Sequence, residues 1–448
     1  MKHSVQSPRQ RLQNHLKAHT LNNKLRAFIL LLSCALLANN SLADAPLSGS
    51  SLFAHVEKYA SLGEHRTGTP ADHATSAWLS AELKNAGFSL QQQSFSVSQF
   101  FPKQQQLSIG KQAYKVFPHW LPAITKADIK APLAPLSSTS LQGKIAYLSP
   151  DNAGLWYQLK PAELAQQAHQ KGALALLIAV PHPSQEIYAS NAEPPHLDQP
   201  IALPTVIIAA KYHRDINKAM QQQKTVRLIS KGQISPAEGR NVLARYPEKT
   251  IANAPWVIIS TPSSGWFQCA GERGSGVALW LDMARHLSRQ QTTSLNWLFI
   301  ANSGHELNMI GAEHSLNITP KPKQVKLWLH LGASIAARQW HQTATGIKPT
   351  NKVHAYNRFY SAGSLLTLFQ YSLADIDDLS LLPIEQLNRS TSELGKIAMR
   401  GYPAAGIVGS HRFFHTPGDT PAVTSSELLA PYGEAMQRLI EQLQKTQL

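Results

Sequence analysis

The fold of this 448-residue chain is decided by two apolar segments, WVIIS at residues 256–260 and LNWLFIA at residues 295–301. Short runs rich in β-branched and aromatic residues are typical of strands that are buried on both faces. Between them, residues 276–287 carry apolar side chains at the spacing of an amphipathic helix. Strands separated by helices predict an α/β fold, a mostly parallel (mixed) sheet covered by helices on both faces. Further expected elements are strands at 325–331 and 404–408 and a closing helix at 426–444.

The segment before this pattern is expected to open with a helix, a loop and a second helix. Apolar residues recur at helical spacing over 52–59 and 74–86, and Gly87 has the place of a C-cap. The intervening residues 63–70 are polar and rich in glycine, which is typical of a loop. A strand is expected at 90–97.

Residues 101–232 are predicted to form a separate inserted domain, with 44–100 and 233–448 making up the α/β domain. The expected order is a strand at 144–148, a helix at 162–170, and strands at 172–178 and 203–208. This order resembles the β-rich protease-associated domain, although an unrelated β-rich insertion is the alternative.

Residues 1–43 have the pattern of a signal peptide. A basic stretch ending at Arg26 precedes an apolar run from Ala27 to Ala38, and small residues end at Ala43. The apolar run is shorter than the ~20 residues that span a bilayer. We therefore expect an exported protein, periplasmic or secreted, without a transmembrane anchor after processing. A lipoprotein modified at Cys34 is the less favoured alternative, because apolar residues continue after that cysteine.

The formal net charge of +15 does not by itself indicate nucleic-acid binding. Six of the Lys and Arg residues lie in 1–43, and the others are spread along the chain without interleaved aromatic residues. Beyond the predicted signal peptide, Cys269 is the only cysteine, so the exported chain is expected to be held together by its core and not by an intramolecular disulfide.

Polar side chains follow the predicted strands, at the edge of a parallel sheet where active sites lie. Carboxylates and histidines converging from separate loops are the groups that metal sites need. No single one of these residues is specific evidence by itself. The segments are Thr261-Pro262-Ser263, Glu272, Ser303-Gly304-His305-Glu306, His330 and His415-Thr416-Pro417-Gly418-Asp419-Thr420.

The order of these segments resembles the co-catalytic zinc exopeptidases, the family of bacterial leucyl aminopeptidase, glutamate carboxypeptidase and the transferrin receptor ectodomain. The resemblance spans nearly all of the chain after the signal and implies their fold. The matching features are the opening at 52–87, Ala270–Ala278, Ser303–Glu306 with Gly311-Ala312, Ser392-Glu393, and the run from His415.

Several positions depart from the family's metal site. Thr261 and Ser263 stand where the family has a His and an Asp, and neither is a usual zinc ligand. By the same resemblance, Glu272 replaces the bridging Asp, His305 replaces the catalytic Glu, and His330 replaces a later Asp. One zinc ion held by Glu272, Glu306 and His415, with His330 as a possible further ligand, is the site that the remaining residues imply.

The resemblance implies an exported zinc-dependent hydrolase, an exopeptidase of aminopeptidase type, in which His305 accepts the proton of a metal-bound water. A non-catalytic relative that acts as a binding module in the envelope is the alternative. Cys269 is a weaker candidate for a nucleophile, since a lone cysteine is more often a small buried hydrophobe. Trp266, Phe267 and Arg273 are expected to contact a peptide or aminoacyl substrate, although the two aromatic residues could equally pack in the core.

Overall fold

The computed structural model describes residues 48–125, 127–192, 197–290, 292–377, 379–387 and 392–445. The predicted signal peptide at 1–43 lies outside this range, so its export function stays a prediction. None of the described helices is both long and apolar enough to cross a membrane.

The described residues contain a 13-stranded mixed sheet, and in the part of it that belongs to the predicted α/β domain the central strands are parallel. In spatial order the strands are β7, β9, β8, β10, β15, β13 and β14, with parallel pairing from β9 to β15 and antiparallel pairing of β7 with β9 and of β13 with β15. Their bounds are Thr225–Tyr246 (β7), Trp256–Pro262 (β8), Asn296–Asn302 (β9), Val325–Leu331 (β10), Asn357–Ser361 (β13), Ser380–Pro383 (β14) and Ala404–Gly409 (β15).

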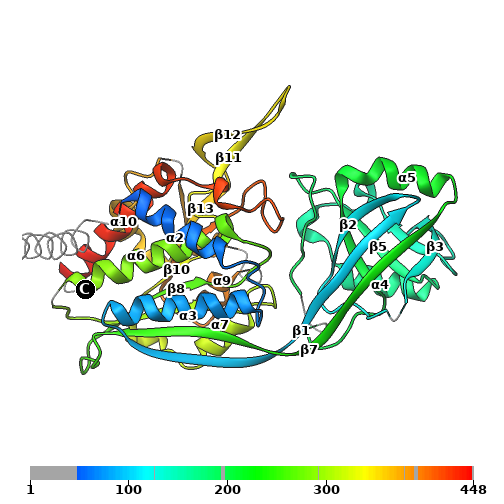
Figure 1. Ribbon diagram of the computed structural model, residues 1–448. Helices are drawn as coiled ribbons and strands as arrows, with labels where there is room; N and C mark the ends of the chain where they lie inside the picture. The colour runs from blue at the N-terminus through cyan, green and yellow to red at the C-terminus, as the bar shows by residue number, and fades with distance from the viewer. Residues whose placement is uncertain are drawn as a thin grey trace, which may run out of the picture. The chain divides into compact units, whose positions relative to one another are not determined.

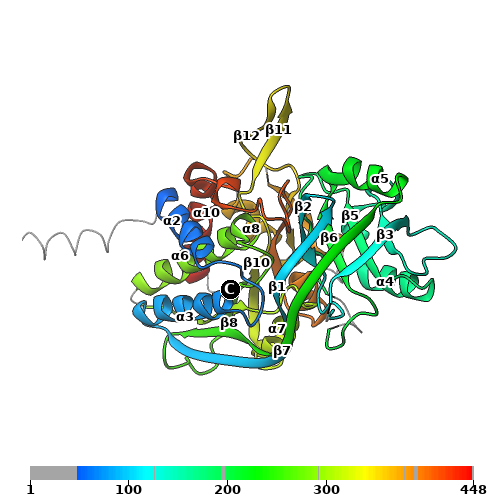
Figure 2. The ribbon, with the colours of Figure 1, turned by 45° about the vertical axis from the view of Figure 1, so that its right-hand side comes forward.

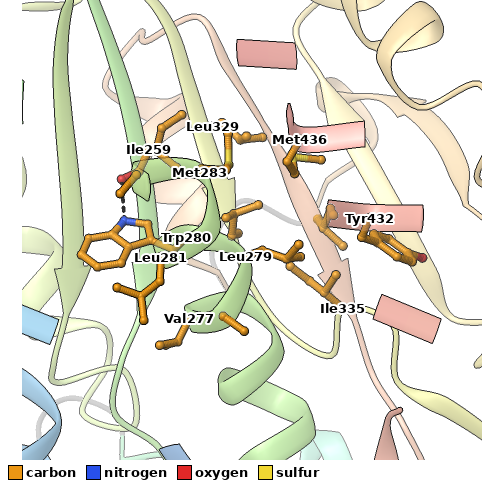
Figure 3. Close-up of a cluster of buried hydrophobic side chains, with 14 of the residues drawn as sticks. Ile259, Val277, Leu279, Trp280, Leu281, Met283, Leu329, Ile335, Tyr432 and Met436 are labelled. Carbon is orange, nitrogen blue, oxygen red and sulfur yellow. Dashed lines mark hydrogen bonds between the residues drawn. The ribbon is translucent and has the colours of Figure 1, made fainter. Parts of the chain in front are cut away.

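Helices cover both faces of this sheet, as the sequence predicts (Figure 1). Alternate residues of β8 point to opposite sides: Ile259 joins the core under α2, α6 and α10, and Ile258 joins the core under α7 and α9. Figure 3 shows the first of these cores, where Trp280 of α6 donates a hydrogen bond to the Ile259 carbonyl at 3.1 Å. The helices are α2 (Gly49–Ser61), α3 (Pro70–Asn85), α6 (Ser275–Arg289), α7 (Ile310–Leu316), α8 (Leu366–Ser372), α9 (Glu393–Met399) and α10 (Ser426–Lys445).

Two long antiparallel strands, β1 (Ser89–Ile109) and β7, run from this sheet into the segment predicted as an insertion (Figure 2). Phe101 pairs with Gln233 and Pro102 with Gly232, so the predicted ends of that segment lie opposite each other in the ladder. The division into two domains stays a prediction. The segment also contains β2 (Gln112–Pro118), β3 (Ile129–Pro135), β4 (Ile145–Leu148), α4 (Pro161–Gln170), β5 (Ala175–Val180), β6 (Thr205–Ala209) and α5 (His213–Gln221).

The expected helices and strands are all found, but several elements were not predicted. The sequence indicated only residues 90–97 of β1, because its outer half lacks a continuous apolar pattern and is fixed by pairing with β7. Strands β11 (Arg338–Thr343) and β12 (Gly346–Val353) form a two-stranded hairpin that is largely exposed and therefore has no burial pattern to detect.

Candidate functional site

The predicted site residues lie at the carboxyl ends of the parallel strands. His305 follows β9, His330 is near the end of β10, and His415 lies in the loop after β15. Glu272 is carried by a π-helical turn, Ala270–Gly274, that leads into α6. His415 has a φ of +58°, a left-handed conformation that non-glycine residues adopt uncommonly. The strand order thus places these loops at one edge of the sheet.

Glu272 and His415 contact each other, as the metal prediction requires, but a third group contacts the same carboxylate. Oε1 of Glu272 lies 3.1 Å from Nε2 of His415 and 2.5 Å from an Nη2 atom of Arg273. The side chains of Glu272 and Arg273 are 0% and 1% exposed. The ring of His415 is oriented by a 2.9 Å hydrogen bond from Nδ1 to the carbonyl of Ala189. A buried cation of the protein therefore lies directly beside the candidate bridging ligand.

The charges of Glu272 and Arg273 stabilise each other. Burial by itself would raise the pKa of the Glu272 carboxyl, but Arg273 and His415 outweigh it and hold that pKa well below its usual range. Burial by itself would lower the pKa of Arg273, and the neighbouring carboxylate reverses this and raises it. Glu272 and Arg273 are thus a charged pair at neutral pH.

Cys269 and Asp419 complete the surroundings of Glu272. The Cys269 thiol donates a hydrogen bond to Oε2 of Glu272 at 3.3 Å. Burial, and secondly the Glu272 charge, raise the pKa of this thiol well above its ordinary value, so it is protonated and not activated as a nucleophile. The carboxylate of Asp419 accepts hydrogen bonds from the backbone N–H groups of Gly271 and Glu272 at 2.6 and 3.1 Å. Asp419 therefore holds the π-helical turn in place.

His305, the predicted proton acceptor, is paired with a carboxylate that the prediction did not include. Its Nδ1 donates to Oε1 of Glu393 at 3.0 Å, and Oε2 of Glu393 accepts from Asn302 at 3.0 Å. Burial, and secondly Arg273, lower the pKa of His305, so the imidazole is neutral at pH 7. Although Glu393 is fully buried, contact with His305 lowers its pKa. The only signal for Glu393 in the sequence was its place in the family pattern at Ser392-Glu393.

Glu306 does not join the cluster around Glu272. Its Oε1 accepts from the backbone N–H of Thr67 at 2.5 Å, and its Oε2 accepts from the Ser264 hydroxyl at 2.8 Å. Oε1 thus attaches the opening loop, residues 63–70, and Oε2 attaches the loop after β8, to the segment that follows β9. Glu306 therefore has other partners in this structure, and an ion shared with Glu272 and His415 stays a prediction.

His330 is buried, and the charged groups that act on its pKa are Glu393, His305 and Arg273. Its Nδ1 lies 2.9 Å from the Ser260 hydroxyl, which accepts from Trp328 at 2.7 Å and therefore donates to His330. Burial lowers the pKa of His330 to about 4, opposed by the charge of Glu393. This ring is a neutral acceptor in the sheet, and its role as a further metal ligand stays a prediction.

Trp266 and Phe267 are buried and pack in a hydrophobic core, the alternative that the sequence left open, and their contact with a substrate stays a prediction. They are 2% and 6% exposed and pack on Phe117 of the inserted segment, with ring centroids 5.8 and 4.9 Å away. The indole of Trp266 donates to Asn191 at 2.8 Å. The charge of Arg273 is buried against Glu272, and its predicted contact with a substrate stays a prediction.

These contacts do not fit a zinc ion on the predicted ligands. Among the described residues, a single group has three ligand-type side-chain atoms all within 4.8 Å of one another, namely Cys269, Glu272 and Asp419. In this group the Asp419 oxygens accept from backbone N–H groups, and Oε1 of Glu272 is already paired with Arg273 and His415. The predicted set Glu272, Glu306 and His415 does not form such a group, and the oxygens of Glu306 are engaged by Thr67 and Ser264.

The overall fold is shared with bacterial aminopeptidases of known structure. A zinc aminopeptidase from Bacillus subtilis superimposes with a TM-score of 0.69 at 18% identity, over 90% of this chain and 97% of that one. A peptidase M28 precursor from Shewanella amazonensis gives 0.68 at 17% identity, over 91% and 95%. An aminopeptidase from Aneurinibacillus sp. strain AM-1 gives 0.61 at 16% identity, over 89% and 94%. No protein-family model and no curated protein sequence matches. The fold of this chain is therefore that of the zinc aminopeptidases.

Proposed function

We propose that this chain is an exported, non-catalytic relative of the zinc aminopeptidases that binds peptides without hydrolysing them through zinc. The observation that carries the proposal is the position of Glu306. Its two carboxylate oxygens accept from Thr67 and Ser264, and among the described residues Glu272, Glu306 and His415 do not form a group with ligand atoms all within 4.8 Å of one another. A scaffold kept for recognition would retain the architecture and lose this convergence.

Peptides are proposed as ligands because the structures with this fold include aminopeptidases. Of the predicted site side chains, His305 is the most exposed, at 14%, and Glu393 fixes the orientation of its ring. Because Nδ1 is engaged by Glu393, the other ring nitrogen, Nε2, is the atom proposed to contact a peptide bound at the strand ends.

The proposal is tested on the purified chain with two measurements. Zinc content is determined by mass spectrometry, and turnover of aminoacyl p-nitroanilides is followed with and without added zinc or chelator. Fluorescence polarisation with labelled tripeptides that have a free amino terminus then reports binding. We expect saturable peptide binding that a chelator leaves unchanged, and no turnover. Zinc-dependent turnover would overturn the proposal.

A His305→Asn variant locates the peptide on the scaffold. It should weaken binding roughly tenfold, the loss expected for one well-placed hydrogen bond. Tyr371→Ser, on α8 with Tyr371 64% exposed, serves as the control and should bind like the wild type.

A second candidate is a hydrolase that uses His305 as a base without zinc. The contact of His305 with Glu393 favours it, since a neutral imidazole oriented by a carboxylate is a typical general base. Turnover that survives a chelator but is abolished in His305→Asn would establish this function instead.

A further inference from the structure

We propose that the guanidinium of Arg273 is a resident cation that neutralises Glu272 and keeps divalent metal ions out of this centre. The inference deepens the proposed non-catalytic function and rests on it. From the sequence, Arg273 was expected to contact the substrate. The inference gives it the role of a counter-ion to Glu272 instead.

The first argument is charge balance at a buried carboxylate. Glu272 is 0% exposed, and an isolated buried carboxylate is costly unless a cation pairs with it. In the zinc-site hypothesis a metal ion supplies that positive charge. Here Nη2 of Arg273, itself 1% exposed, lies 2.5 Å from Oε1 of the carboxylate. The requirement for a cation is thus met within two adjacent residues.

The second argument is that His415 faces the same oxygen. Its Nε2 lies 3.1 Å from Oε1 of Glu272, and its Nδ1 lies 2.9 Å from the Ala189 carbonyl. Both ring nitrogens of His415 thus already have partners inside the protein. A divalent cation at Oε1 of Glu272 would have to displace the contact with His415 while lying close to the guanidinium.

The third argument is that the side chain of Arg273 is fixed in place. Its Nε donates to the Ser264 carbonyl at 3.2 Å, and Ser264 is the residue whose hydroxyl also engages Glu306. Ser264, in the loop after β8, therefore contacts both Arg273 and the carboxylate of Glu306. The guanidinium cannot swing out to admit an ion without breaking this contact.

Zinc titration of four chains tests the inference: the wild type, Arg273→Lys, Arg273→Met and the double variant Glu272→Gln/Arg273→Met. Equilibrium dialysis against zinc chloride gives the zinc bound per chain, and thermal unfolding gives Tm. We expect the wild type and Arg273→Lys, which keep the charge, to bind no stoichiometric zinc and to show a Tm unchanged by zinc or chelator.

Arg273→Met keeps an unbranched, flexible side chain, shorter than that of arginine, and removes the charge. It should lower Tm by roughly 5–10 °C, because removing one partner of a buried pair leaves the other unpaired. It should also gain zinc binding that raises Tm. The double variant, which has no unpaired charge, should recover much of the lost Tm and bind no zinc. If Arg273→Met alone does not fold, recovery of a folded chain in the double variant supports the neutralising role of Arg273, and stoichiometric zinc in the wild type or in Arg273→Lys overturns the inference.

Stoichiometric zinc in the wild type would overturn the inference. So would an Arg273→Met chain that folds with the wild-type Tm, or one that folds and takes up no zinc, because the guanidinium would then not be what excludes the ion. A wild-type chain that binds neither zinc nor peptide would leave the inference standing and remove only the proposed peptide-binding function.

Discussion

Glu393 accepts a hydrogen bond from Nδ1 of His305 at 3.0 Å, although the two residues are 88 positions apart in the chain. The second oxygen of Glu393 accepts from Asn302, the last residue of β9. The carboxylate therefore connects the start of α9 to the end of a central strand. It also engages Nδ1 of His305, so Nε2 is the ring nitrogen left for the proposed peptide contact.

Glu393→Gln tests this connection. The amide keeps the shape but has a single acceptor oxygen, so either Asn302 or His305 loses its partner in a buried setting. We expect the free energy of unfolding to fall by about 1–3 kcal/mol, measured by urea denaturation. Glu385→Gln, an exposed position nearby, is the control and should change stability by less than about 0.5 kcal/mol. Equal effects at both positions would mean that the Glu393 contact contributes nothing.

The sheet could be predicted from the sequence because its signals are local. Each residue of β8 and β9 is buried or nearly so, and such strands are read from a short apolar run. The long ladder of β1 and β7 could not be predicted in full, since its outer pairs, such as Ser108 with Arg227, join residues far apart in sequence. Gly311, noted only as part of a family pattern, has a physical reason in the structure: a Cβ atom there would lie 1.8 Å from the Ser303 carbonyl oxygen.

The sequence indicated which residues lie at the site, but it did not indicate which of their side chains contact one another. Sequence position indicates that Glu306 lies at a strand end, but not that its carboxylate turns toward Thr67, 239 positions earlier. Likewise, Arg273 was visible beside Glu272 in the sequence, yet its direction depends on Ser264 and on the π-helical turn. Side-chain direction in such loops is set by tertiary contacts that no local pattern encodes.

Trp266→Phe separates core packing from substrate contact. The change removes the indole N–H that donates to Asn191 at 2.8 Å, so we expect a loss of about 1 kcal/mol in stability and unchanged peptide affinity. Trp340→Phe is the matched control, because no acceptor for the Trp340 indole is found in the described part of the chain. Urea denaturation and fluorescence polarisation measure the two quantities. Peptide binding lost in Trp266→Phe at full stability would restore the prediction of a substrate contact.

Cys269 should be inert in the folded protein. Its thiol is fully buried and protonated, and alkylation requires an accessible thiolate. We expect iodoacetamide at pH 7.5 to leave the Cys269 peptide unmodified for hours in buffer and to modify it fully in urea, as read by mass spectrometry. Free glutathione in the same reaction reports that the reagent is active. Rapid labelling of the native chain would revive the nucleophile hypothesis.

Asp282 of α6 should make stability depend on pH. The residue is 0% exposed, its Oδ2 accepts only a long 3.4 Å hydrogen bond from Gln437 of α10, and Oδ1 has no partner among the described residues. Burial, opposed by Gln437, raises its pKa from 3.8 to about 7. The helix interface therefore favours the protonated carboxyl.

The sign follows from comparing the two states. Between pH 4 and pH 7 the unfolded chain releases this proton and the folded chain retains it, so this group's contribution to stability falls as pH rises through that window. Above pH 7 the full penalty applies, on the order of 4 kcal/mol for a shift of this size. Asp282→Asn stays neutral at every pH and should escape the penalty.

Urea denaturation of both chains at pH 5, 6, 7 and 8 measures the effect. The stability of Asp282→Asn relative to the wild type should increase steadily with pH, reaching a few kcal/mol at pH 8. Asp151→Asn, at a position with 80% side-chain exposure, should run parallel to the wild type and controls for the general loss of a negative charge. Parallel curves for Asp282→Asn as well would show that its carboxyl ionises normally in the folded chain, because water or a rearranged Gln437 solvates it.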